Sequence, residues 1–258
     1  MIKAFLFDLD GVFYVDNNII PGALSTLKWL NEKNIQYKFI TNNTTSSRLK
    51  LLNKLKNLGL STEKENIISA NFAGVLFLEK IGVKSCELIL PESGIDDYKK
   101  FKIVKKNPEV IVVGDIGNNW TFELMNDLLE KILNGSKLIA LHKGRYYQSK
   151  SGIKIDSGAF VSGLEHSASV EAKVIGKPQT TFFELASKDF KCGPNQIAMV
   201  GDDLINDIGG AKKMGYKSFL VKTGKFREKI YTNSNIKPDY LIESILDLPK
   251  FLISNNLI

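Results

Sequence analysis

The sequence predicts an α/β fold built on a doubly wound parallel sheet, with a smaller α/β layer inserted in the middle of the chain. Two observations predict it. Short apolar runs of strand length alternate with amphipathic stretches of helix length, as they do when helices cover both faces of a parallel sheet. The 258 residues also exceed the commonest single-domain length of about 100 to 200, which favours a large insertion or two modest domains.

The first part of the chain reads as strand, helix, strand, helix. The run at 3–7 is apolar and ends in acidic residues and a glycine, which is typical of a buried strand that meets a turn. Pro21 and Gly22 precede an amphipathic stripe, and Gly59 closes a later row of leucines. The expected elements are a strand over 3–7, a helix over 23–30, a strand over 37–40 and a helix over 49–58.

The alternation continues to the end of the chain. In the middle we expect strands over 86–90, 110–113 and 138–141, with a helix over 122–133 that Asn134 and Gly135 end. In the last part we expect helices over 180–188, 204–214 and 244–253, with strands over 197–200 and 218–221. Composition marks no linker between these parts.

The composition excludes several classes of protein. Hydrophobic residues make up 43% and charged residues 24%, which are ordinary globular values and argue against disorder. No apolar run approaches the roughly 20 residues that span a bilayer, and acids appear within ten residues of the start, so we expect an unexported, cytoplasmic protein. Cys86 and Cys192 are far apart, which argues against a disulfide framework or a zinc site.

The charge balance argues against nucleic acid as a partner. The chain has 35 basic and 28 acidic residues, a net charge of +7, but only Arg48, Arg145 and Arg227 are arginine. Specific nucleic-acid readers rely on arginine, and the lysines here are scattered. The excess of lysine therefore indicates solvated faces, with at most a mild attraction for anionic substrates.

Polar residues follow several of the expected strands. In an open parallel sheet, ligands bind beyond the carboxyl ends of the strands, so these positions are the first candidates for a site. Asp8 and Asp10 follow the first strand and lie on the same side of an extended segment. The other candidates are the stretch Thr41, Asn42 and Asn43, which offers hydroxyl, amide and N–H donors for an anion, a single ammonium at Lys177, and an acidic cluster of Asp202, Asp203 and Asp207.

Taken singly, each group has an ordinary explanation: an Asp-Gly turn, a helix N-cap, a solvated lysine and acids that complement a helix dipole. Together they suit phosphoryl transfer. Carboxylates hold Mg²⁺, while donors and a lysine stabilise charge on the phosphoryl oxygens. An aspartate can then attack phosphorus to give an aspartyl-phosphate, and a second aspartate can protonate the leaving oxygen and activate water.

These stretches resemble the four motifs of the haloacid dehalogenase superfamily of phosphatases. The matching residues are Phe7-Asp8-Leu9-Asp10-Gly11-Val12, Ile40-Thr41-Asn42-Asn43, Gly176-Lys177-Pro178 and Val200-Gly201-Asp202-Asp203 with Asp207. The long interval before Lys177 is similar to subclass IIA, which carries an α/β cap of the C2 type. Further stretches, 141–147, 158–161 and 221–225, resemble the branch that contains phospholysine phosphohistidine inorganic pyrophosphate phosphatase and the haloacid dehalogenase-like hydrolase domain-containing proteins.

The resemblance implies a role for each candidate residue. Asp8 would be the nucleophile and a magnesium ligand, Asp10 the general acid/base and a ligand through its carbonyl, and Asp202 the third ligand. Asp203 and Asp207 would support the metal site through water or hydrogen bonds without binding the metal directly. The phosphate would be held by Thr41, Asn42, Asn43 and Lys177, the last of which also neutralises Asp8. Residues 12–21 would form a flap hairpin beside the nucleophile.

The resemblance also implies a Rossmann-like catalytic core of residues 1–82 and 171–258 and a cap of residues 83–170. The cap would close over a small phosphorylated substrate, with a phosphomonoester, pyrophosphate or P–N bond, and would form a homodimer contact. Sugar and nucleotide phosphatases of this type carry Thr-Asn-x-Asp after the cap strand, whereas His142-Lys143-Gly144-Arg145 stands here. We expect Arg145 or Lys143 to meet the remote end of the substrate.

Two other functions remain open on the sequence: a receiver-like phospho-acceptor, and a protein that binds a phosphorylated metabolite without catalysis. The length argues against a receiver, because that domain needs no insert of about ninety residues. His142 has no carboxylate partner nearby in the sequence, so we interpret it as a surface or packing residue.

Overall fold

A computed structural model describes residues 1–149 and 152–258 of the chain. The chain divides into two compact units. The first comprises residues 1–41, 51–68 and 177–258, and the second comprises residues 42–50 and 69–176. The predicted insert, 83–170, falls inside the second unit. Both units contain a parallel sheet flanked by helices, which confirms the predicted α/β class.

The sheet of the first unit has the strand order β15-β14-β13-β1-β4-β5. The strands are β1 (Ala4–Asp8), β4 (Gln36–Thr41), β5 (Ile67–Ser69), β13 (Ile197–Gly201), β14 (Lys217–Val221) and β15 (Tyr240–Ile242). β1 lies centrally and pairs in parallel with both β4 and β13. Because the strand order reverses at β1, the carboxyl ends of these three strands form the edge where doubly wound sheets bind ligands.

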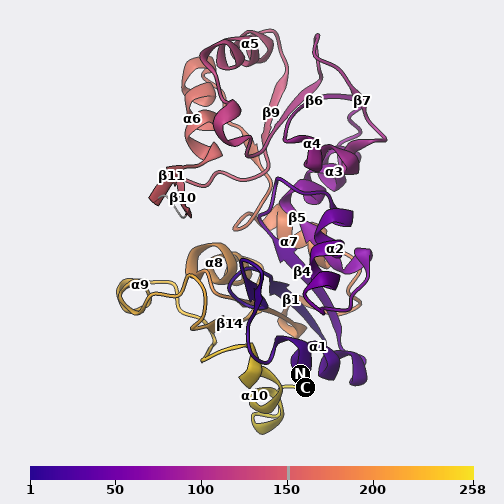
Figure 1. Cartoon of the computed structure of the whole chain (residues 1–258), viewed down its shortest axis with the longest axis vertical. Coiled ribbons are helices and arrows are strands. Elements are labelled where there is room, and N and C mark those ends of the chain that lie inside the picture. The colour runs from indigo at the N-terminus through magenta and orange to yellow at the C-terminus, as the bar shows by residue number, and fades with distance from the viewer. Residues whose placement is uncertain (150–151) are drawn as a thin grey trace. The chain divides into compact units, whose positions relative to one another are not determined.

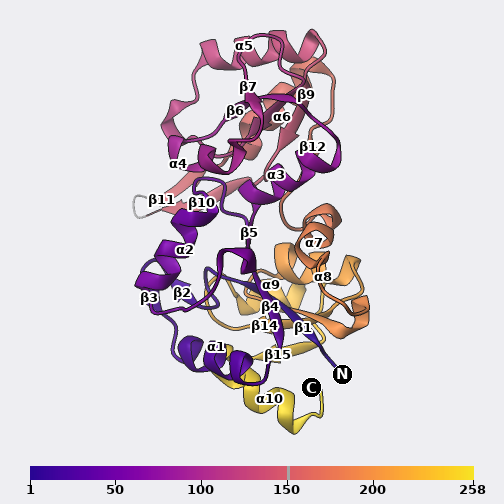
Figure 2. The same ribbon diagram turned by 90° about the vertical axis from the view of Figure 1, so that its right-hand side faces the viewer.

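Helices pack on both faces of this sheet, as Figure 2 shows. Phe5 and Phe7 of β1 share one core with helices α1 (Ala23–Glu32), α2 (Arg48–Asn57) and α10 (Leu248–Ser254). Helices α7 (Thr180–Ser187) and α8 (Gly209–Lys213) contact β4 and β14. The two termini meet beside α10, where the Ile2 N–H donates to the Leu257 carbonyl. Because helices cover both faces of the sheet, β1 and β13 are buried along their whole length.

The segment after β13 differs from the single helix predicted over 204–214. Leu204–Ile208 form a π-helical turn, in which the Gly209 N–H bonds the Leu204 carbonyl five residues back, and only then does α8 begin. Gly209 and Gly210 favour the α-helix weakly, and Gly215, at φ +70°, ends it. The prediction was wrong about the first turn, which carries Asp207.

The second unit has a five-stranded parallel sheet in the order β12-β9-β8-β6-β7. Its strands are β6 (Ser85–Ile89), β7 (Lys102–Ile103), β8 (Val110–Val113), β9 (Lys137–Ala140) and β12 (Lys173–Val174), and its helices are α3 (Ala70–Lys80), α4 (Glu92–Ile95), α5 (Phe122–Leu133) and α6 (Ser157–Ala168). α5 and α6 lie side by side (Figure 1). Ile111, Leu128 and Val161 are among the residues that form the core of this unit.

Smaller elements complete the two units. A hairpin of β10 (Tyr146–Ser149) and β11 (Gly152–Ile155) belongs to the second unit, while β2 (Tyr14–Val15), β3 (Asn18–Ile19) and α9 (Glu228–Asn233) belong to the first. The β2–β3 hairpin stands where a flap was expected over 12–21. Among the described helices, none combines the length and the apolar character that crossing a bilayer requires.

Candidate active site

Lys177 lies between two buried carboxylates. Its Nζ is 2.6 Å from Asp8 Oδ1 and 2.7 Å from Asp207 Oδ1, and all three residues are buried. Lys177 stands just before α7, which begins at Thr180 as predicted. Since a buried ammonium is stable only when it is paired, the fold fixes Lys177 against the end of β1.

The charges in this group shift one another's protonation. Burial lowers the pKa of Lys177, but the Asp207 and Asp8 carboxylates outweigh it and hold that pKa above its ordinary value. Burial and the neighbouring Asp8 raise the pKa of the Asp207 carboxyl, against the opposing effect of Lys177. Lys177 is therefore a permanent cation among crowded acids.

Asp202 follows β13 and has one oxygen without a partner. Its Oδ2 accepts a hydrogen bond from the Lys225 N–H at 2.7 Å, whereas Oδ1 is buried with no hydrogen-bond partner among the described residues. Burial, Asp8 and Asp207 raise the pKa of Asp202 to about 8. Gly11 and Gly224 lie so close that a Cβ on either would come within 1.9 or 2.0 Å of Oδ2. The backbone thus closes tightly around this carboxylate.

Asp203 and Asp207 shape the π-helical turn. Asp203 Oδ1 accepts from the N–H groups of Ile205 and Asn206, which caps the turn. Asp207 Oδ2 accepts from the Asp203 N–H at 3.0 Å, while its Oδ1 holds Lys177. Both oxygens of Asp207 are therefore engaged by the protein, which suits a supporting position more than direct ligation.

Asp10 lies in the turn after β1, outside the buried group. It is bridged to Tyr14 and remains partly exposed, unlike Asp8. Burial of part of the carboxyl and the charge of Asp8 nevertheless raise its pKa, against the opposing charge of Lys54. Lys54 Nζ lies 4.0 Å from the centre of the Tyr14 ring. Asp10 thus combines solvent access with an increased tendency to hold a proton.

The predicted phosphate-binding stretch crosses from one unit to the other. Thr41 is the last residue of β4 in the first unit, and Lys177 Nζ lies 3.5 Å from the neighbouring Ile40 carbonyl. Asn42 and Asn43 belong to the second unit. There Asn43 Oδ1 accepts from the Ser46 N–H at 2.9 Å, so that its amide holds the following turn.

The predicted substrate-contacting residues lie at the start of the β10–β11 hairpin. Arg145 is exposed, whereas the ammonium of Lys143 pairs with Glu165. His142 Nε2 lies 3.5 Å from Asp156 Oδ1 and 3.2 Å from Ser157 Oγ. No carboxylate is near His142 in the sequence, as stated above, but the fold brings Asp156, the N-cap of α6, next to it.

Comparisons with known proteins identify the family. Residues 5–101 match the family described as haloacid dehalogenase-like hydrolase, and residues 174–248 match a related family described as HAD-like hydrolase. Haloacid dehalogenase-like hydrolase domain-containing protein 2 of Bos taurus is 34% identical over 94% of this chain and 93% of its own length. The chain belongs to the haloacid dehalogenase-like hydrolases.

Two further relatives cover almost the whole chain. Phospholysine phosphohistidine inorganic pyrophosphate phosphatase of Xenopus laevis is 28% identical over 98% of this chain and 96% of its own length. The structure of p-nitrophenyl phosphatase from Archaeoglobus fulgidus superposes with a TM-score of 0.91 at 27% identity, covering 97% of this chain and 99% of that one. The predicted superfamily and subclass are confirmed.

The two matched ranges contain the core candidates and leave out the hairpin. Asp8, Asp10 and Thr41 lie in the first range, and Lys177 and the acidic cluster lie in the second. Arg145 lies between the two ranges.

The carboxylates of this haloacid dehalogenase-like site fit a divalent cation. Among the described residues, one oxygen each of Asp8, Asp202 and Asp207 lie within 4.8 Å of one another. These three carboxylates and one ammonium leave about two negative charges without compensation, and Asp202 Oδ1 lacks a hydrogen-bond donor. Oxygen ligands and this charge are what Mg²⁺ prefers. The carboxylate of Asp10 is outside this group.

Sequence reasoning singled out residues 221–225 for their resemblance to one branch of the superfamily but gave this loop after β14 no role in the site. Lys225 donates its N–H to Asp202, and Thr223 donates its hydroxyl to the Gly11 carbonyl, so residues 223–225 close one side of the haloacid dehalogenase-like site. The available signal was positional, since this loop also follows the carboxyl end of a strand of the same sheet. Its role in the site was not inferred because Thr223, Gly224 and Lys225 carry no acidic or amide group.

Proposed function

We propose that this protein is a magnesium-dependent phosphatase that acts on small phosphorylated compounds through an aspartyl-phosphate on Asp8. As a haloacid dehalogenase-like hydrolase with phosphatase relatives, the chain is a phosphohydrolase. The observation that carries the mechanism is the buried group of Asp8, Lys177, Asp202 and Asp207 at the carboxyl edge of the sheet. Carboxylate attack divides one difficult displacement into two easier ones.

Asp8 is the nucleophile in this proposal. Its carboxylate forms a bond to phosphorus while the bond from phosphorus to the leaving group breaks. Lys177, held 2.6 Å from Asp8 Oδ1, offsets the repulsion between that carboxylate and the phosphate dianion. The Lys177 cation costs no reorganisation during the reaction because Asp207 already fixes its position.

Asp10 is the general acid/base. It gives its proton to the leaving group in the first step, accepts a proton from the attacking water in the second, and so releases phosphate from Asp8. The raised pKa of Asp10 favours the protonated carboxyl needed at the start, and its exposure gives it access to water.

Magnesium would be held by Asp8, Asp202 and the Asp10 carbonyl, with support from Asp203 and Asp207. When bound, it supplies positive charge that draws the phosphoryl oxygens toward the carboxylates. The partnerless Oδ1 of Asp202 supports this assignment, because a buried carboxylate oxygen is costly without a donor or a cation.

The phosphoryl oxygens would be bound by Thr41, Asn42 and Lys177, with Asn43 shaping the turn. For the remote end of the substrate we propose Arg145 over Lys143, because the Lys143 ammonium is already paired with Glu165. Residues 83–170 would act as the cap and exclude water during transfer. A homodimer through this segment stays a prediction that light scattering of the purified protein tests.

The test is phosphate release from pyrophosphate, phosphohistidine, phospholysine, sugar phosphates, nucleotides and p-nitrophenyl phosphate, with magnesium and with EDTA. We expect metal-dependent release that Asp8→Asn abolishes while its circular dichroism stays that of the wild type. An Asp8→Asn enzyme with more than about 1% of the wild-type rate would contradict the nucleophilic role, since loss of a covalent nucleophile costs several powers of ten. Arg145→Ala should raise KM with little change in kcat.

A further inference from the structure

A cavity lies in the first unit, apart from the buried carboxylates of the candidate active site. It has a volume of about 470 Å³, within the range of small-molecule sites. Ile205 and Ile236 form an apolar part of its lining, with Gly209 between the elements that carry them. None of Asp8, Lys177, Asp202 and Asp207 lines it.

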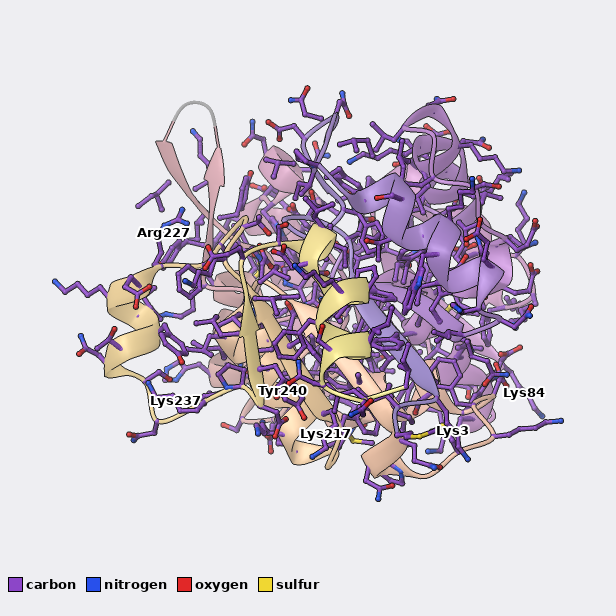
Figure 3. All side chains as sticks on the ribbon, turned by 90° about the horizontal axis from the view of Figure 1, so that it is seen from below. Lys3, Lys84, Lys217, Arg227, Lys237 and Tyr240 are labelled. Carbon is purple, nitrogen blue, oxygen red and sulfur yellow. The ribbon has the colours of Figure 1, made fainter. Side chains whose placement is uncertain are left out.

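The rest of the lining is strongly basic. Lys212, Lys213 and Lys237 all line the cavity, and no acidic residue is among its lining in the described part of the chain. Lys212 is paired with Asp239 at 3.0 Å, and Lys237 donates to the Tyr231 carbonyl at 2.6 Å. Lys237 lies at the surface beside α9 (Figure 3). Within the described residues, the ammonium groups of Lys213 and Lys237 are therefore left without a carboxylate partner.

The cavity wall is built to keep its shape. The Ile236 N–H bonds Ser234 Oγ at 3.0 Å, and the Lys237 ammonium lies 4.5 Å from the centre of the Tyr231 ring. These contacts fix the segment after α9 against the small core around Leu204 and Ile208. The Asn235 amide, which also lines the cavity, adds a neutral hydrogen-bonding group.

We propose that this cavity binds an organic anion with a flat apolar body, and that binding there slows the enzyme. The apolar body would lie against Ile205 and Ile236, and the anionic group would be held by Lys213 and Lys237. A bare inorganic anion would gain only the weak, screened attraction of exposed lysines, and a neutral aromatic would lose that attraction. Both parts of the ligand are needed.

Two segments that line the cavity also position residues of the proposed active site. Ile205 is 59% exposed in the same π-helical turn whose Asp207 holds Lys177. Pro178, which also lines the cavity, directly follows Lys177. A ligand bound between Ile205 and Ile236 therefore restrains the two segments that position the Lys177–Asp207 contact. These are the π-helical turn that carries Asp207 and the chain at Pro178. This effect on turnover rests on the proposed function, whereas the binding itself does not.

The binding test uses the fluorescent anion 8-anilinonaphthalene-1-sulfonate with the whole protein. We expect Lys213→Glu to weaken binding about tenfold, since it reverses a charge beside the sulfonate. Ile205→Ser removes part of the apolar wall at an exposed position and should weaken it similarly. Lys250→Glu, the same charge change on the exposed face of α10, should leave affinity within about twofold. Equal affinity in all four proteins would overturn the proposal.

The turnover test follows p-nitrophenyl phosphate hydrolysis with the same probe. We expect the probe to lower kcat severalfold with KM unchanged in the wild type and in Lys250→Glu, and to have that effect in Lys213→Glu only at about tenfold higher concentration. A rise in KM alone would show competition at the catalytic site and would overturn the proposal. A protein that binds the probe as expected and hydrolyses no substrate would contradict the proposed function and leave the binding site standing.

Discussion

Lys177 Nζ and Asp207 Oδ1 lie 2.7 Å apart in the interior of the protein, although Lys177 precedes α7 and Asp207 belongs to the turn after β13. Both residues are buried, with at most 5% of the surface of either one exposed to solvent. The pair joins two strand-end segments of the sheet at the nucleophile, so it bears on stability as well as on reactivity.

Lys177→Met should destabilise the metal-free protein by about 3–5 kcal/mol, because it leaves the Asp8 and Asp207 carboxylates buried without their cation. Adding Asp207→Asn should recover part of that loss, since the amide removes one of the unpaired charges. Urea denaturation of the two single variants and the double variant measures the coupling. The exposed pair of Lys99 and Asp96 serves as the control, and the same cycle of variants there should show a far smaller coupling free energy. Strict additivity at Lys177 and Asp207 would contradict the structure.

Asp202→Asn should have opposite effects with and without metal. In EDTA the variant should be at least as stable as the wild type, because burial and two neighbouring carboxylates disfavour the Asp202 charge. Magnesium at about 100 times its Kd should stabilise the wild type by about 2.7 kcal/mol and the variant hardly at all. Thermal unfolding with EDTA or MgCl2 checks both. Full magnesium stabilisation of the variant would exclude Asp202 as a ligand.

The positions of Asp8, Thr41 and Asp202 were predictable because each lies at the end of a short strand that is mostly apolar and buried. Parallel topology then brings such strand ends to one edge. The contact of Lys177 with Asp8 was expected from the family resemblance, but its contact with Asp207 was not predictable, because it depends on the π-helical turn. That turn arises from the Asp203 cap and two consecutive glycines, which a periodicity of 3.6 does not reveal.

Helices α3 and α6 were missed for a related reason. Ala70, Ala73, Gly74 and Val75 of α3 are buried on several sides, so that helix shows no amphipathic stripe. Helix α6 contains Gly158 and Gly163, whose low helix propensity masks it in the sequence. Gly158 is required there by close packing, since a Cβ would lie 2.3 Å from the Gly144 carbonyl oxygen. Both helices therefore form because of tertiary contacts, which the local sequence pattern does not reveal.

Gly11→Ala should impair both folding and metal binding, because Gly11 has φ +83° and its Cβ would lie 1.9 Å from Asp202 Oδ2. Gly215→Ala is the matched control: its φ is +70°, but a Cβ there meets nothing within 4 Å. The control should lose only the cost of left-handed backbone, about 1–2 kcal/mol, and keep its magnesium response. Thermal unfolding with and without magnesium separates the two. Equal losses of stability and of magnesium response in Gly11→Ala and Gly215→Ala would show that the contact with Asp202 is unimportant.

Asp239→Asn should reveal a pH-dependent contribution far from the carboxylate group. Burial tends to raise the pKa of Asp239, but hydrogen bonds from the Ser218 hydroxyl, from Lys212 and from the Ser218 N–H hold it below its ordinary value. A carboxyl with a lowered folded-state pKa adds stability above its unfolded pKa of about 3.9 and loses it as pH falls through the folded value. The wild type should therefore exceed Asp239→Asn in unfolding free energy by a constant amount from about pH 7 to pH 5.

That difference should shrink below about pH 4, because Asp239 is protonated in the unfolded chain at a higher pH than in the folded protein. Urea denaturation of the two proteins at a series of pH values measures it. Lys212→Met removes one of the groups that lower the folded-state pKa, so in that background the pH-dependent part of the difference should be smaller and its decline should be complete at a higher pH. A difference between wild type and Asp239→Asn that stays constant down to pH 3 would mean that Asp239 titrates alike in the folded and unfolded chains. Its contacts with Ser218 and Lys212 would then contribute through shape and neutral hydrogen bonding alone.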